Sequence, residues 1–299
     1  MNVTLLVNPA ARGGAQTGPA TRAAERLRAH GVRTTIISGG SAAESSRLLR
    51  AAIDFGTDAV AVAGGDGTVR LAIQELAGSS VPLGIIPTGT GNDTATAVGL
   101  RELDPDSAAD AIAAGRTRRI DLARVRRSDG STAYFGSVLA SGFDSRVNDR
   151  ANAMRWPRGR SRYNIALLRE FFTLKGIPYQ VDLEMADGTQ ERFDGDLVMG
   201  TVGNGSSYGG GIPICPDADP ADGLLDVVLV RPAGRLRLLR LLPRVYRGTH
   251  TTIPEVETYR VRSVRLAAPG VTAYADGDPI GMLPLQIEVA PGALLVFTP

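Results

Sequence analysis

The chain has 299 residues, of which 43% are hydrophobic and 21% are charged, and its formal net charge is only +2. These values are typical of a globular protein with room for two cores, and they argue against a nucleic-acid partner, which requires a strongly basic surface. The single cysteine, Cys215, excludes an intramolecular disulfide and a cysteine metal cluster. The sequence shows no signal peptide and no apolar run of about 20 residues, so it predicts a cytoplasmic protein.

Strands and helices alternate in the predicted structure of residues 1–116. Helical spacing of apolar residues predicts helices at 19–30, from Ser41 to about residue 53, and at 69–76. Apolar runs predict four buried strands, which are 2–7, 33–37, 58–63 and 83–86. This order is typical of a parallel sheet with right-handed crossovers. We therefore expect the turns that follow the strands to meet at one edge, where such sheets bind ligands.

Two glycine-rich turns, GGDGT at 64–68 and TGTGND at 88–93, follow the third and fourth predicted strands. Glycine lets backbone N–H groups approach an anion closely, and a helix that starts there adds positive charge. The carboxylates of Asp66 and Asp93 would repel a phosphate unless a divalent cation lay between them. The pair of turns therefore predicts a site for Mg²⁺ and a nucleotide polyphosphate, although two ordinary tight turns would have the same composition.

Strands predominate from about residue 116 onward. Helices are predicted only at 163–174 and 236–246. The predicted strands are 118–126, 132–140, 179–185, 197–202, 224–230, 256–266, 271–275, 285–289 and 294–297. We interpret 1–116 as an α/β domain and 117–289 as a β-rich sandwich, with residues 290–299 returning to the first domain.

Two acidic turns of the second domain are candidate sites. Asp276 and Asp278 flank Gly277 just after a strand, which suits a carboxylate that accepts a hydroxyl proton during phosphoryl transfer and a neighbour that helps to hold metal. A plain hairpin turn is the alternative. In the stretch 216–226, Asp222 and the following backbone could present oxygens to a hard cation, or the stretch could be a solvated turn.

Motifs across nearly the whole chain resemble those of the diacylglycerol-kinase-like lipid kinases, in their bacterial soluble branch, which is related to sphingosine and ceramide kinases. The matching segments are Asn8-Pro9 with Gly13-Gly14, 64–68, 87–93, 203–218, 221–227 and 276–278. The resemblance implies an NAD-kinase-like α/β domain with a parallel sheet, followed by a β-sandwich domain, with the active site in the cleft between them.

By the same resemblance, ATP is expected to contact the turns after the first four strands. The expected nucleotide-binding residues are Asn8, Pro9, Ala10, Ala11, Arg12, Ser38, Gly64, Gly65, Gly67, Thr68, Gly89, Thr90, Asn92 and Asp93.

The resemblance also implies two magnesium sites and a general base. Asp66 and Asp93 would organise Mg²⁺ through water, and either Asp276 or Asp278 would be the base while the other joined the metal network. A structural Mg²⁺ site would be formed by Asp219, Asp222 and the Leu224 carbonyl.

Three positions depart from the family pattern. The family usually has Glu at the position of Asp278, an Asn-Glu pair at the position of Arg70-Leu71, and a small residue at the position of Arg12. Arg12 and Arg70 could supply charge for phosphate or could be plain surface residues. These departures bear on the geometry of the nucleotide and the metal.

The resemblance implies an ATP- and Mg²⁺-dependent kinase that phosphorylates a lipid hydroxyl, with diacylglycerol as the first candidate. An NAD kinase and a non-catalytic nucleotide or lipid sensor are the alternatives. Two segments could contact the inner face of the membrane: the arginine-rich helix 236–247 and the loop 150–163, which holds Trp156. Each could equally pack on the protein itself. Exposed strand edges could also form a homodimer.

Overall fold

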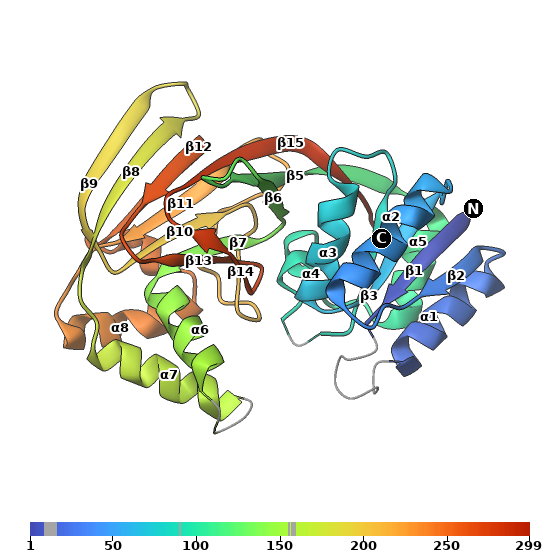
Figure 1. Cartoon of the computed structure of the whole chain (residues 1–299), viewed down its shortest axis with the longest axis horizontal. Coiled ribbons are helices and arrows are strands. Elements are labelled where there is room, and N and C mark those ends of the chain that lie inside the picture. The colour runs from blue at the N-terminus through green and yellow to red at the C-terminus, as the bar shows by residue number, and fades with distance from the viewer. Residues whose placement is uncertain (9–16, 90, 155, 157–159) are drawn as a thin grey trace.

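A parallel four-stranded sheet lies at the centre of the first third of the chain (Figure 1). β3 (Ala59–Gly64) lies between β1 (Asn2–Val7) and β4 (Leu83–Pro87), and β2 (Arg33–Ile37) lies at the edge, next to β1. The structure, a computed structural model, describes every residue except 9–16, 90, 155 and 157–159. Because the four strands are parallel, the turns that follow them lie at one edge of the sheet.

Helices cover both faces of this sheet, since its strands are apolar on both sides. On one face lie α1 (Thr17–Ala29) and α5 (Pro105–Ala114), and on the other α2 (Ala42–Asp54) and α3 (Asp66–Leu76). The short α4 (Asp93–Ala97) follows the turn after β4. The helix predicted at 69–76 thus starts three residues earlier, so that Asp66 is its first residue rather than part of the preceding turn.

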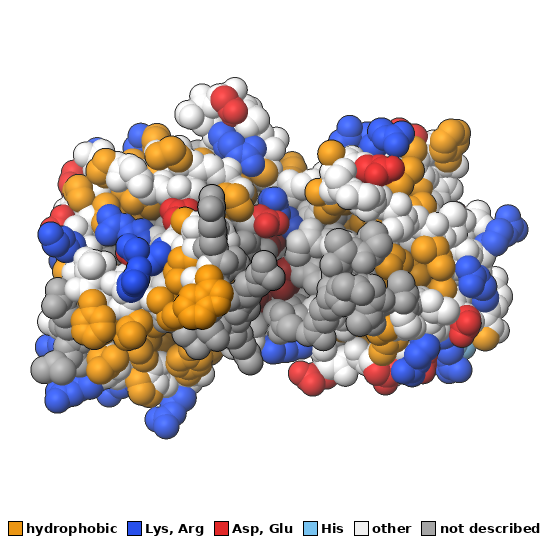
Figure 2. Space-filling view, turned by 60° about the horizontal axis from the view of Figure 1, so that its bottom comes forward, with side chains coloured by type: hydrophobic (Ala, Val, Ile, Leu, Met, Phe, Trp, Pro, Cys, Tyr) orange, Lys and Arg blue, Asp and Glu red, His pale blue; other side chains and the backbone are white. Residues whose placement is uncertain are grey.

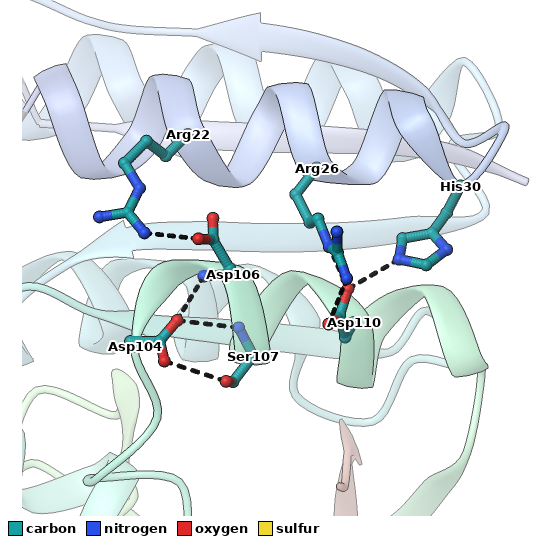
Figure 3. Close-up of polar contacts among 7 residues, drawn as sticks. All are labelled: Arg22, Arg26, His30, Asp104, Asp106, Ser107 and Asp110. Carbon is teal, nitrogen blue, oxygen red and sulfur yellow. Dashed lines mark hydrogen bonds and ion pairs between the residues drawn. The ribbon is translucent and has the colours of Figure 1, made fainter.

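Ion pairs join the outer surfaces of α1 and α5, which lie side by side (Figure 3). Arg22 contacts Asp106 at 2.5 Å, while Arg26 and His30 contact Asp110 at 2.6 and 2.7 Å. All of these side chains are solvent-exposed, so water and salt screen the pairs and each adds little to stability. The apolar faces of the two helices against the sheet therefore contribute more than their polar contacts.

The rest of the chain is mostly antiparallel sheet with three helices packed on one side of it (Figure 1). The helices are α6 (Phe143–Ala153), α7 (Arg160–Phe172) and α8 (Arg235–Tyr246), followed by a short 3₁₀ turn η2 (His250–Thr252). The strands are β5 (Thr117–Arg126), β6 (Thr132–Phe135), β7 (Val138–Gly142), β8 (Ile177–Met185), β9 (Gln190–Leu197), β10 (Met199–Gly203), β11 (Leu225–Val230), β12 (Val256–Ala267), β13 (Thr272–Ala275), β14 (Asp278–Met282) and β15 (Leu285–Phe297).

The last strand, β15, connects the two parts of the molecule. Its first half pairs with β12, β5 runs antiparallel along its length, and Val296 near its end pairs in parallel with Leu83 of β4. The predicted domain boundary at 116/117 falls between α5 and β5, and the division into two domains remains our proposal. We call the parts before and after this boundary the first and second halves.

Several predicted elements have different bounds in the structure. The strand predicted at 132–140 is two strands, because the Gly136 and Ser137 N–H groups donate to the Asp276 carboxylate instead of to a neighbouring strand. The strands predicted at 285–289 and 294–297 are one strand, β15, with a shift in register. β9 has a mostly polar, solvent-exposed sequence, which explains why apolar periodicity missed it. The helices α5 and α6 and the strand β14 were missed too.

In the part of the chain that the structure describes, every helix is too short or too polar to cross a lipid bilayer.

Candidate active site

The turn after β3 leaves the first backbone N–H groups of α3 without a side-chain cap. Gly65 caps the helix and has no side chain to bond the first N–H groups, which also lack partners within the helix. A Cβ on Gly89 would lie 2.5 Å from the Cα of Gly65, so the two glycine turns are in backbone contact. This close approach requires glycine at both positions.

Asp66 ties the two glycine turns together. Its carboxylate accepts hydrogen bonds from the N–H groups of Asn92 at 2.8 Å and Asp93 at 2.7 Å. Asn92 has a positive φ of 57°, and its side-chain amide bonds both the N–H and the carbonyl of Gly89 at 3.1 Å. Burial and then the nearby Asp93 carboxylate raise the pKa of Asp66.

The Asp93 carboxylate contacts the second half of the chain. Its carboxylate accepts hydrogen bonds from Gly210 N–H at 3.0 Å and Gly211 N–H at 2.9 Å, and Arg101 donates to the Gly210 carbonyl at 3.0 Å. Residues 209–211 all have a positive φ, which only glycine adopts without strain. This glycine loop and Arg101 belong to the site. In the sequence, the family motif at 203–218 pointed to the loop, whereas Arg101 was not singled out.

Asp276 is buried at the break between β6 and β7. Its two carboxylate oxygens accept hydrogen bonds from Gly136 N–H at 2.9 Å and Ser137 N–H at 3.0 Å. Burial raises its pKa to about 6, the two hydrogen bonds oppose this, and the nearby Asp66 carboxylate adds to it. Asp66 and Asp276, 210 residues apart in sequence, therefore lie in one electrostatic environment.

Asp278, the other candidate base, lies closer to solvent. Its carboxylate is 48% exposed and forms an ion pair with Arg70 of α3, with 3.1 Å between Nε and Oδ2. The pair crosses from the first half of the chain to the second. Figure 2 shows acidic side chains between the two halves of the molecule.

Two other predicted nucleotide-binding residues follow β1 and β2, the other two strands of the parallel sheet. Asn8 comes directly after β1 and Ser38 directly after β2, and both are solvent-exposed. The structure thus brings Asn8, Ser38 and the two glycine turns to one edge of the sheet. Of the predicted residues, Pro9, Ala10, Ala11, Arg12 and Thr90 lie outside the described part of the chain.

The predicted structural Mg²⁺ site lies in the turn before β11. Asp219 accepts a hydrogen bond from Ala221 N–H at 3.0 Å, and Asp222 accepts one from Leu224 N–H at 2.9 Å and pairs with Arg260. No group of three or more acids, histidines or cysteines among the described residues could hold a metal. A cation here would have to replace Arg260 at Asp222, and the site stays a prediction.

Asp121 of β5, which the sequence analysis missed, anchors this acidic turn to β15. Its carboxylate accepts hydrogen bonds from Gly223 N–H and Gly292 N–H, both at 2.7 Å. Asn204 donates to the Asp121 carbonyl and to the Gly136 carbonyl, each at 3.0 Å. This buried network holds the backbone around Asp276 in place.

Comparisons with known proteins identify related chains. The family model of the diacylglycerol kinase catalytic domain matches residues 2–125, and the model of the YegS C-terminal NAD kinase beta sandwich-like domain matches residues 137–298. A diacylglycerol kinase of Mycobacterium tuberculosis (strain ATCC 25618 / H37Rv) is 48% identical over 297 residues, which are 99% of this chain and 95% of that protein.

A protein of Yersinia enterocolitica (serotype O:8 / biotype 1B) named "Probable lipid kinase YegS-like" is 30% identical over 284 residues, or 91% of this chain and 89% of its own length. The crystal structure of a diacylglycerol kinase from Bacillus anthracis str. Sterne superposes with a TM-score of 0.72 at 21% identity, covering 100% of this chain and 97% of that one. At this identity the superposition supports the fold alone. The predicted α/β-plus-sandwich fold is confirmed.

Proposed function

Because the chain belongs to the diacylglycerol-kinase-like family and is a lipid kinase, we propose that it transfers the γ-phosphoryl group of Mg²⁺-bound ATP to the hydroxyl of diacylglycerol. The product would be phosphatidic acid. The observation that carries this proposal is that Asp66 joins both glycine turns, while Asp276 from the other half of the chain lies in the same acidic environment. A phosphate donor and a proton acceptor can therefore meet in one cleft.

The glycine edge of the sheet would hold the triphosphate of ATP. The start of α3 offers backbone N–H groups and the positive end of the helix dipole, and the contact between Gly65 and Gly89 brings a second turn to the same place. Such a surface binds oxygens that carry negative charge and excludes side chains. Positioning of this kind is the main source of rate in phosphoryl transfer.

Mg²⁺ would enter with the nucleotide. The residues described here include no group of three acids that could cage a metal directly, so the carboxylates fit a cation held chiefly by phosphate oxygens and water, with Asp66 and Asp93 beyond that water. When bound, Mg²⁺ would neutralise negative charge on the phosphates. The spare lone pairs of Asp66 would orient the water.

Asp276 would accept the proton of the lipid hydroxyl. Its raised pKa, about 6, makes it a stronger base than an ordinary aspartate while leaving it ionised at neutral pH. As the hydroxyl oxygen bonds to the γ-phosphorus, the bond from that phosphorus to the bridging oxygen of ADP breaks and the proton moves to the carboxylate. Asp278 is the alternative base.

The function is tested by offering the purified chain MgATP with vesicles that contain diacylglycerol, sphingosine, ceramide or a polyprenol, and separately with NAD. Mass spectrometry would detect the phosphorylated product. We expect phosphatidic acid, lost on chelation of Mg²⁺ and in Asp276→Asn. Transfer to NAD alone would favour an NAD kinase, and transfer to another lipid would correct the acceptor.

A lipid acceptor requires contact with a membrane, and we propose that α7 and α8 provide it. Ile165, Leu168 and Phe172 of α7 are solvent-exposed and recur at helical spacing on one face. Trp156 before this helix and Leu239 and Tyr246 of α8 are exposed as well. We call these six side chains the docking surface. Figure 2 shows hydrophobic side chains interspersed with basic ones over this part of the molecule.

The basic residues make this surface suited to anionic lipid. Arg240, Arg244 and Arg247 are exposed on or just after α8, while Leu238 packs into the core beneath. Leu239, unlike the neighbouring Leu238, is exposed to solvent. Arg158 of the predicted contact loop lies outside the described residues. Apolar side chains rimmed by arginine can enter the interface of an anionic membrane.

Vesicle co-sedimentation of Leu168→Ser/Phe172→Ser tests the docking surface. We expect the double variant to lose binding to phosphatidylglycerol vesicles and to show a raised KM for vesicle diacylglycerol, with kcat toward a short-chain soluble diacylglycerol unchanged. Phe55, which is 91% exposed in the first half of the chain, supplies the matched control Phe55→Ser. Equal loss in the control, or no loss in the double variant, would refute this surface.

We place this peripheral contact on the cytoplasmic side of the membrane, where ATP is available. A homodimer through an exposed edge strand such as β2 stays a prediction, which sedimentation velocity would test.

A further inference from the structure

We propose that Arg70 is a positioning residue, which holds Asp278 and thereby fixes the turn that carries Asp276 against the phosphate-binding half of the chain. The inference rests on the proposed function. Arg70 lies on α3, one helical turn after Asp66, and its Nε is 3.1 Å from Oδ2 of Asp278. The two residues are 208 positions apart, so the contact joins the two halves across the cleft.

The turn that Arg70 restrains is short. Ala275 of β13 pairs with Asp278 of β14, so only Asp276 and Gly277 lie between them. Both of these residues have a positive φ, 48° for Asp276 and 88° for Gly277. A restraint on the Asp278 side chain therefore acts within two residues of the proposed base.

The same face of α3 makes a second contact with the other half of the chain. Gln74, four residues after Arg70, donates to the Tyr134 carbonyl at 2.7 Å and accepts from Tyr134 N–H at 2.9 Å. A Cβ on Gly67 would lie 3.9 Å from Oδ2 of Asp278, which places this carboxylate over the first turn of the helix. The helix that carries Asp66 thus contacts the turn after Asp276, through Asp278, and also β6, which leads into the Gly136 and Ser137 N–H groups that bond Asp276.

The exposure of the ion pair argues for a geometric role rather than a stabilising one. The Arg70 side chain is 22% exposed and that of Asp278 is 48% exposed, and pairs with this much solvent contact add little to folding. The charge of Arg70 also acts on the Asp276 carboxylate, so the guanidinium is the cation next to both acids. Arg70 and Asp278 are two of the positions that depart from the family pattern, and here they contact each other.

A double-mutant cycle tests this role with Arg70→Gln, Asp278→Asn and the double variant, assayed on a short-chain soluble diacylglycerol. We expect Arg70→Gln to lower kcat about 10- to 100-fold, with little change in the KM for ATP, and to have no further effect in Asp278→Asn. Additive losses would show that Arg70 acts independently of Asp278 and would overturn the proposal. An unchanged kcat would overturn it too.

Arg50→Gln is the matched control, because Arg50 of α2 pairs with Glu75 of α3 away from the cleft. It should leave kcat unchanged. If Arg70→Gln fails to fold, Arg70→Lys replaces it in the cycle, since lysine keeps the charge but lacks the planar fork that fixes a carboxylate. We expect the same non-additivity with a smaller loss.

Hydrogen exchange gives a readout that does not depend on turnover. Residues 272–282 should lose protection in Arg70→Gln and keep it in Arg50→Gln. If the wild-type chain phosphorylates no lipid but this result holds, the proposed function fails and the positioning role stands. If the wild-type chain turns over and the exchange of 272–282 is unchanged, the positioning role fails.

Discussion

The substitution Asp144→Asn should make the protein more stable at neutral pH. Asp144 lies in the first turn of α6 and is buried, and the Tyr208 hydroxyl donates a hydrogen bond to its Oδ2 at 2.6 Å. Burial raises the pKa of Asp144 from 3.8 to about 6, against the opposing effect of this hydrogen bond. An asparagine oxygen can accept the same bond without carrying a charge.

Protonation of Asp144 is coupled to folding, and this coupling gives the direction and the size of the change in the free energy of unfolding. Because the folded-state pKa is above the unfolded value, the native state binds the proton more tightly, so the contribution of Asp144 to stability is greatest below about pH 4 and is lost as the pH rises through about 6. A shift of about two pKa units corresponds to about 3 kcal/mol at neutral pH. The helix N-terminus favours the carboxylate by up to about 1 kcal/mol. We expect Asp144→Asn to raise the free energy of unfolding by about 1–2 kcal/mol at pH 7.5.

Urea denaturation of the ligand-free protein at pH 7.5 and pH 4.5 measures this difference. The gain should shrink at the lower pH, where the wild-type carboxyl is largely protonated. Asp149→Asn is the control, because Asp149 lies on the same helix and accepts a bond from the Tyr274 hydroxyl at 2.6 Å but is exposed to solvent. A variant less stable than wild type at pH 7.5, or a gain that is independent of pH, would refute the reasoning.

Four further outcomes are expected. The kcat/KM of the wild-type chain should fall about tenfold per pH unit below about pH 6, because Asp276 must be ionised to accept a proton, and a flat profile to pH 5 would contradict this. Asp121→Ala should lower the free energy of unfolding by about 2–4 kcal/mol in urea, since two backbone N–H groups lose their acceptor. Asp110→Ala should lower the free energy of unfolding only slightly, because its pairs with Arg26 and His30 are exposed, and the loss should shrink further at high salt. Ile73→Ala, which empties a fully buried position, should cost about 2–5 kcal/mol by the same measurement.

The sequence predicted well where the signal was local. The apolar strands 2–7 and 33–37 have the predicted bounds, and Ser41 caps α2 as expected, because strand burial and helix capping depend on neighbouring residues. The family, the fold class and the lipid kinase activity are confirmed. The polar strand β9 was not predicted, because an exposed strand lacks alternating apolar residues.

The partners of the charged side chains could not be read from the sequence. Asp93 bonds a loop that lies 117 and 118 residues further on, and Arg70 reaches Asp278 across 208 residues. The sequence analysis assigned Asp93 to the nucleotide and the metal, and Asp278 to the base or the metal network. It left Arg70 undecided between phosphate and surface. Nothing near Arg70 in the chain distinguishes a surface arginine from one that faces the cleft.

The sequence by itself determined most of the apolar strands, which turns are glycine-rich and which family the chain resembles, since these depend on residue types and short spacings. Only the tertiary structure decided that Gly136 and Ser137 hold Asp276, and that α7 exposes its apolar side chains to solvent. The physical reason is that the strength of a carboxylate's hydrogen bonds and the cost of its burial depend on groups brought close by the packing of the two halves.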